Sequence, residues 1–122
     1  MFRRRGALPP GFERVAAAVE RAKAAALAAV PAPRREPESI ASAVLALEGA
    51  LGDARDALTA WTEGPAAIRE RCREAVEETA RRAEWLRLEA PPMDFESLVL
   101  VLGDVIAPLD AFVEAEHELR RG

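Results

Sequence analysis

Apolar residues recur along this chain at spacings of three and four, which is the period of one face of an α-helix. The pattern is strongest over residues 38–63, where apolar positions alternate at intervals of four and three without a miss. Similar stripes run through residues 11–30, 65–89 and 93–120. Alternation of the strand type does not extend over a useful length anywhere. The pattern therefore predicts an all-α chain with four helices over these ranges.

The stripes define a predicted core, because an amphipathic helix buries one apolar face. Its main members are Phe12, Val15, Val19, Ala22, Ala26, Ile40, Val44, Leu47, Leu51, Ala54, Leu58, Trp61, Ile68, Cys72, Ala75, Thr79, Ala83, Leu86, Phe95, Leu98, Leu102, Val105, Leu109 and Phe112. Three further residues widen the last stripe, namely Val99, Ile106 and Val113.

Proline-containing breaks separate the four stripes and indicate short connections. Short connections between long helices favour antiparallel neighbours, so the chain is predicted to be an up-down-up-down four-helix bundle. Residues 11–122 are expected to form a single domain, preceded by a basic, flexible segment over residues 1–10. The charges of the segments support this order. In such a bundle the first helix neighbours the second and the fourth, and residues 1–37 are basic whereas residues 38–64 and 93–122 are acidic.

Helix-disfavouring residues fall inside two of the predicted helices. Gly49 and Gly52 lie in the second, and Gly103 and Pro108 lie in the fourth. Pro108 lacks a backbone N–H and is expected to kink the fourth helix near Gly103 and Pro108. Counted from the helix starts, the glycines and the polar core residue Thr79 fall at a similar height. One interpretation is close helix packing with a kink, and the other is a mid-bundle cavity for a small apolar ligand.

Composition excludes several classes of protein. The chain has 122 residues, half of them apolar and 31% charged, with a net charge of -4 at pH 7. This profile is typical of a folded protein rather than a disordered one. The negative charge argues against nucleic-acid binding, which needs a basic surface. The longest run of large apolar residues, 98–102, is far too short to span a membrane.

The single cysteine, Cys72, leaves no internal disulfide and suits a reducing cytoplasm. The basic start of the chain is not followed by the apolar region of a secretion signal. The chain has no Asn, Gln or Tyr and is rich in Ala and Arg, which indicates a GC-rich bacterial genome. We therefore expect a bacterial cytoplasmic protein. Cys72 lies on an apolar stripe, where a thiol acts as a small hydrophobic group.

The only histidine, His117, follows Glu114 by three residues. Carboxylate-bridged di-iron sites in four-helix bundles use this Glu-x-x-His spacing, but they need two such pairs. A two-fold dimer could supply the second pair, with Glu48 or another acid as a bridging ligand. His117 falls on the flank of its helix in the last turn, where a solvated cation is favoured. We expect a solvated helix end, and the dimeric metal site stays an alternative.

Four apolar residues lie outside the main stripes, namely Trp85, Leu88, Leu100 and Val101. Apolar residues beyond the core stripe either widen it or cover a partner, and Trp is favoured as an interface anchor. Arg81 lies one turn before Trp85, close enough to cover its ring. The alternative is that Trp85 and Leu88 cover the proline-containing loops. These residues nevertheless predict a protein interface, with a homodimer as the first expectation.

The chain lacks a phosphate-binding glycine loop, a nucleophile elbow and a zinc ligand set. We therefore expect a helical bundle of unassigned function that associates with itself or with another protein. We expect no enzymatic activity, no cofactor, no nucleic acid and no membrane contact. The two alternatives are binding of a small apolar ligand at the glycine level and the dimeric metal site.

Overall fold

The computed structural model describes residues 8–28, 37–89 and 95–121. Within these ranges every regular element is helical and there is no strand. The elements are α1 (Phe12–Leu27), α2 (Pro37–Ala60), α3 (Ala66–Glu89), α4 (Phe95–Ile106), the 3₁₀ segment η1 (Ala107–Asp110) and α5 (Ala111–Arg121). The all-α prediction is confirmed for the described residues. Helices lie within or close to all four predicted ranges, and the fourth range contains α4, η1 and α5 instead of one continuous α-helix.

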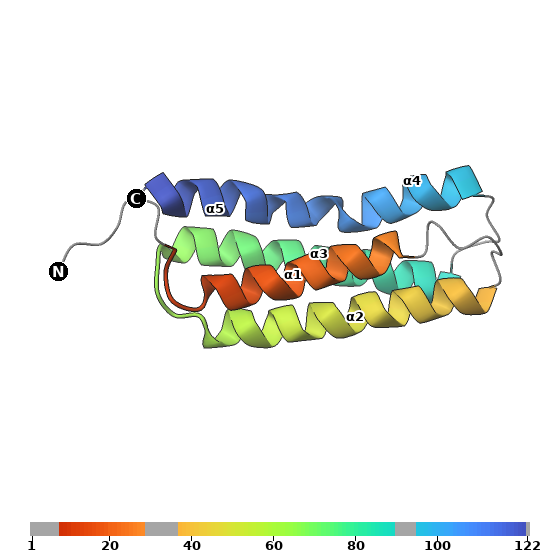
Figure 1. Cartoon of the computed structure of the whole chain (residues 1–122), viewed down its shortest axis with the longest axis horizontal. Coiled ribbons are helices and arrows are strands. Elements are labelled where there is room, and N and C mark those ends of the chain that lie inside the picture. The colour runs from red at the N-terminus through yellow and green to blue at the C-terminus, as the bar shows by residue number, and fades with distance from the viewer. Residues whose placement is uncertain (1–7, 29–36, 90–94, 122) are drawn as a thin grey trace.

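The helices pack side by side as a bundle (Figure 1). Four helical rods share the long axis of the molecule, and the fourth rod consists of α4, η1 and α5 in succession. The second helix packs against α1 and α3, whereas α3 also packs against η1 and α5. The first half of the fourth rod, α4, touches α1 and α3 only sparsely. No helix in the described part of the chain is long and apolar enough to cross a membrane.

The core follows the predicted stripes. Every predicted main-stripe residue whose side chain the structure describes is buried, whereas Ile40 and Phe95 lie outside the described side chains. Within the described helices, six further residues are buried that the stripes did not include, namely Ala18, Ala50, Ala57, Val76, Ala115 and Leu119. These mainly small residues lie beside the stripes, where neighbouring helices come close. The prediction that Val99 and Val113 widen the core is wrong, because both side chains are exposed.

Pro108 divides the fourth rod. Its α-helix ends at Ile106, and four residues form the 3₁₀ segment before α5 begins. Pro108 has no N–H to donate to the carbonyl oxygen of Asp104, four residues earlier. In the structure that oxygen accepts a hydrogen bond of 2.6 Å from Nη1 of Arg82 on α3. A side chain of the neighbouring helix thus replaces the hydrogen bond that proline removes.

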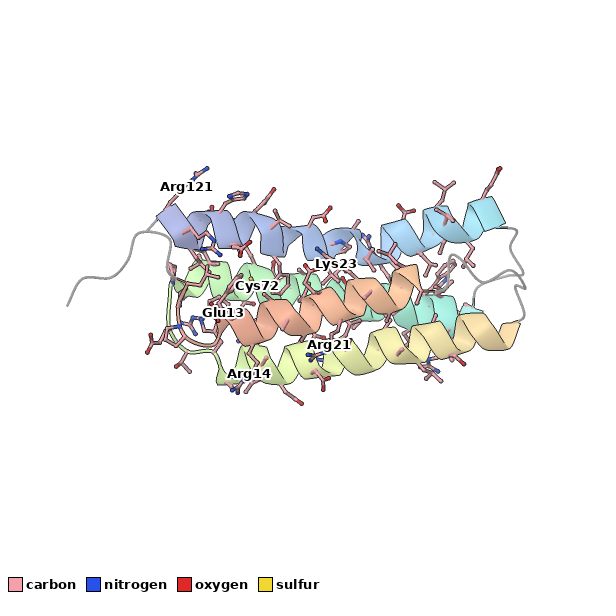
Figure 2. All side chains as sticks on the ribbon, viewed as in Figure 1. Glu13, Arg14, Arg21, Lys23, Cys72 and Arg121 are labelled. Carbon is pink, nitrogen blue, oxygen red and sulfur yellow. The ribbon has the colours of Figure 1, made fainter. Side chains whose placement is uncertain are left out.

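Ion pairs join the outer surfaces of adjacent helices. Arg21 on α1 lies 3.6 Å from Asp53 on α2 (Figure 2). Arginines of α3 pair in both directions, with Glu48 on α2 and Glu118 on α5, and Glu77 of α3 accepts a two-pronged contact from Arg55. Exposed pairs of this kind each contribute about 0–1 kcal/mol, so they favour an arrangement more than they add stability. The third helix, rather than the first, carries most of these contacts.

The segment before α1 is partly ordered. Pro9 is buried and Leu8 packs against the core, whereas residues 1–7 lie outside the described residues. The backbone turns into α1 through Gly11, which has a φ of 94°, and the amide of Phe12 donates to the carbonyl oxygen of Pro9. Leu8 and Pro9 thus pack against the bundle, and the flexible segment expected over residues 1–10 stays a prediction.

Candidate interaction surface

An open groove of about 660 Å³ runs between α3 and α4. Its lining residues are Glu78, Arg81, Arg82, Trp85, Val101, Asp104 and Val105. The groove follows from the sparse contact between α4 and α3, because η1 packs on α3 while α4 touches it only lightly. Trp85, Val101 and Val105 give the groove its apolar part, and the first two were predicted as interface residues.

Charged side chains on the α3 wall hold one another in place. Glu78 accepts hydrogen bonds from Arg81 and Arg82, the latter with 3.0 Å between Nε and Oε1. These two guanidinium groups lower the pKa of Glu78 below its ordinary value, because they stabilise the carboxylate form. The expected stacking of Arg81 on Trp85 is not part of this arrangement, since Arg81 directs its Nε to Glu78 at 3.1 Å.

The predicted interface residues are accessible to different degrees. Leu100 is 71% exposed, Leu88 62% and Trp85 44%. Val101 is half-buried and packs against the core, so only part of its side chain faces the groove. We call Trp85, Leu88, Leu100 and Val101 the Trp85 patch. The alternative prediction was that Trp85 and Leu88 cover the proline-containing loops. The loops over residues 29–36 and 90–94 lie outside the described residues, so this alternative stays a prediction.

Among the described side chains, most of the exposed large apolar ones lie at one end of the bundle. Six of these seven belong to the end of α1, the first half of α2, the end of α3 and α4, which meet at the same end in Figure 1. They are Leu27, Leu45, Trp85, Leu88, Val99 and Leu100, and the seventh is Val113 on α5. Leu27 and Leu45 were missed at the sequence level, although both lie off the main stripes of their helices.

The opposite end of the bundle is closed around Trp61. This side chain is 1% exposed, and its ring meets that of Phe12 edge-on with 5.4 Å between centroids. Gly11 and Gly64 both have positive φ, and a Cβ added at Gly11 would lie 3.1 Å from Cδ1 of Trp61. The indole Nε1 of Trp61 is buried without a hydrogen-bond partner. Two glycine turns therefore let the chain close over the ring.

The residues at the level of the predicted cavity do not surround one interior space. They are Gly49, Gly52, Thr79, Gly103 and Pro108. Gly49 and Gly103 are exposed, and a Cβ added at Gly49, Gly52 or Gly103 would meet nothing within 4 Å. Gly52 instead lines an open groove of about 330 Å³ between α2 and α3. Thr79 is fully buried, and its hydroxyl donates to the carbonyl oxygen of Ala75 at 2.9 Å.

The described residues therefore support neither close helix packing at these glycines nor a cavity that they share, and the kink of the fourth helix stays a prediction. Gly49 and Gly103 are exposed, and Gly52 lies beside α3 at an open groove, where an added Cβ would meet nothing within 4 Å. Gly49 and Gly52 also do not interrupt α2, which continues through both to Ala60. Pro108 is half-buried in η1, and its effect is the local change of helix type.

The candidate metal ligands lie on the surface. Glu114 and His117 are both exposed on α5. Among the described residues no group of three or more His, Cys, Asp or Glu side chains is placed to hold a metal ion. The expectation of a solvated helix end agrees with this exposure. Cys72 is fully buried inside the bundle (Figure 2), and burial raises the pKa of its thiol to about 11.

Comparison with known proteins does not help to interpret these geometries. No protein-family model, curated protein or solved structure matches the chain. Function must therefore be argued from the chain's own surface. The feature that differs most from an ordinary helical-bundle surface is the end that carries the Trp85 patch.

Proposed function

We propose that this protein acts by protein–protein association, and that it associates first with a second copy of itself through the Trp85 patch. The single observation that carries the proposal is the exposure of Trp85, Leu88 and Leu100 around an open groove between two helices. Trp is enriched among the residues that contribute most to binding at protein interfaces. Apolar side chains clustered on one part of a surface mark interaction sites, whereas single scattered ones do not.

The proposal includes a topology. We infer an up-down-up-down bundle whose fourth helix bends at η1, so that α4 diverges from α3 and opens the groove. The bend follows from Pro108, and the hydrogen bond from Arg82 to Asp104 fastens the bundle at this point. We also infer that the protein is bacterial and cytoplasmic and has no enzymatic activity. This inference rests on the composition of the chain and on the buried, free thiol of Cys72.

A small-ligand role has less support. Ligand pockets are mostly apolar and bury most of the ligand surface. The groove at Trp85 is open, and four of its seven lining residues are charged. A dimeric metal site has less support as well, because Glu114 and His117 lie on α5 whereas the Trp85 patch lies on α3 and α4. A dimer formed through the patch would leave the two histidines in solvent.

The test is the solution mass, measured by size-exclusion chromatography with light scattering. The expected result is twice the monomer mass of 13.2 kDa. Trp85→Ala should return the protein to the monomer without loss of helix content by circular dichroism. Val113→Ala is the matched control, because Val113 is an exposed apolar residue at the other end of the bundle. A wild-type protein that stays monomeric at high micromolar concentration would refute self-association.

A further inference from the structure

The two walls of the groove differ in charge. Within the groove the α3 wall carries Glu78, Arg81 and Arg82, which sum to +1, whereas the α4 wall carries Asp104 alone. Over its full length α4 contains two acidic residues, Glu96 and Asp104, and no Lys or Arg. A second acidic α4 helix would therefore meet a wall of favourable charge on α3. Such complementarity selects the partner and its orientation more than it adds affinity.

The outer face of α4 carries a protruding apolar side chain beside the groove. Leu100 is the most exposed of the large apolar residues described, and its neighbour in sequence, Val101, lines the groove. Gly103 and Ala107 lie one and two turns further along the same outer face and are both exposed. These small residues let another helix approach α4 closely. One helix thus offers both a side chain that can be inserted and a groove that can receive one.

A surface with this property is complementary to itself. In a two-fold dimer each copy uses the same patch, and every contact occurs twice. We propose that the occupant of the groove is α4 of a second copy, with Leu100 of each subunit inserted beside Trp85 and Val101 of the other. This inference rests on the proposed self-association and specifies its interface. Glu96 of each α4 then lies toward Arg81 of the other subunit.

The arrangement explains two features of the monomer together. Trp85 is only 44% exposed, because it forms a wall of the groove, whereas Leu100 is 71% exposed, because it protrudes. A receiving residue and an inserted residue are expected to differ in this way. Helix-in-groove binding by an unrelated protein would require the groove but would leave the protruding Leu100 without a role.

The first test changes Leu100 to a charged residue. Leu100→Asp should weaken the dimer at least ~100-fold, because it places a carboxylate against an indole ring and an apolar wall. Val113→Asp is the matched control, since it adds the same charge to an exposed apolar site on α5. Dissociation constants come from analytical ultracentrifugation over a concentration series. Circular dichroism of both variants verifies that the bundle is folded.

The second test is a cross-link between two different chains. Cys72→Ala removes the only native thiol, and Leu100→Cys and Trp85→Cys are then introduced in separate chains. Mixed under oxidised glutathione, the two chains should form a disulfide-linked heterodimer. A mixture of Val113→Cys with Trp85→Cys should not. These single cysteines report which residues meet even when the variants bind more weakly.

The outcomes separate the two proposals. A monomeric wild-type protein overturns both of them. A dimer that survives Leu100→Asp, or that forms the control cross-link instead, leaves self-association standing and overturns the insertion of α4. Loss of the dimer in Leu100→Asp together with the Leu100–Trp85 cross-link supports both.

Discussion

The two tryptophans of this protein lie at opposite ends of the bundle and have opposite surroundings. Trp61 is buried among Phe12, Gly11 and Gly64, and the turn before α1 closes over it. Trp85 forms a wall of an open groove and is 44% exposed. The same residue type therefore closes the core at one end and faces solvent at the other. Its position relative to the apolar stripe decides which of these occurs.

This difference suggests that one end of the bundle contributes to the stability of the fold, whereas the other end is available for association. At the closed end, burial of an aromatic ring removes a large apolar area from water and contributes to folding. At the open end, the equivalent area remains available for a partner. Substitutions at the two ends should consequently affect different measurements, and each prediction below breaks or sharpens that contrast.

The largest effect is expected from truncating the two tryptophans in parallel. Trp61→Ala should lower the free energy of unfolding by about 3–5 kcal/mol, because it leaves a cavity in the core. Trp85→Ala should change the unfolding free energy of the monomer by less than about 0.5 kcal/mol. Urea denaturation at a concentration below dimer formation measures both values. Similar losses for the two variants would contradict the contrast between the ends.

Alanine scanning of glycines gives the next largest difference. Gly11→Ala should destabilise by about 1–2 kcal/mol, since Gly11 has a φ of 94° that L-residues avoid. Its new Cβ would also lie 3.1 Å from Trp61. Gly103→Ala should instead stabilise by about 0.5–1 kcal/mol, because an exposed helical glycine is replaced without a clash. Thermal unfolding compares the two variants, and a loss of stability in Gly103→Ala would refute the open surface described for it.

A smaller effect is expected where Arg82 meets the carbonyl oxygen of Asp104. Arg82→Ala should lower the unfolding free energy by about 1 kcal/mol, the net value of one hydrogen bond. In a Pro108→Ala background the loss should be smaller, because residue 108 regains an N–H that can donate to the same oxygen. A double-mutant cycle in urea measures this coupling. Equal losses in both backgrounds would mean that Arg82 does not compensate for Pro108.

The smallest effect at neutral pH concerns Cys72. Its folded-state pKa of about 11 lies above its ordinary value of 9.0, so the folded state retains the thiol proton longer than the unfolded state. The associated stability is fully present below pH 9.0 and is lost as pH rises toward 11. Cys72→Ala should flatten the dependence of stability on pH over this window. If the slope of stability against pH is unchanged in Cys72→Ala, other groups cause the pH dependence.

Reaction with a thiol reagent sharpens the same point. Cys72 is fully buried in the half of α3 nearest Trp61, so modification at pH 8 requires that this half opens. Trp61→Ala should accelerate the reaction, whereas Trp85→Ala should leave its rate unchanged. Equal acceleration by both variants would show that the two ends open together.

Prediction from sequence succeeded where structure depends on local periodicity. Every member of the stripe from Val44 to Trp61 is buried, and the stripe missed only the small residues Ala50 and Ala57 among the buried side chains described on α2. It failed where a residue's surroundings depend on a neighbouring helix. Gly49 and Gly103 fall at similar heights in their helices, but height along an axis does not indicate which way a residue faces. Both face solvent, so they do not line a space shared between their helices.

The interface residues show the same division. Trp85, Leu88 and Leu100 were identified from their positions off the stripes, and the structure describes all three as exposed. The groove itself had no sequence signal, because it arises from the distance between α3 and α4. The role of Arg82 was also missed, since nothing in its neighbourhood in sequence connects it to Pro108 across the bundle.

By itself the sequence determined that this protein is helical, which residues form most of its core and that proline interrupts its last helix. Those properties follow from 3.6 residues per turn and from the missing N–H of proline, both of which are local. The tertiary structure alone decided that Arg82 donates to the carbonyl oxygen of Asp104, that Gly49 and Gly103 face water and that Trp61 is enclosed while Trp85 is open. Such outcomes depend on the distance and orientation between separate helices. The spacing of residues within one helix does not determine that distance or orientation.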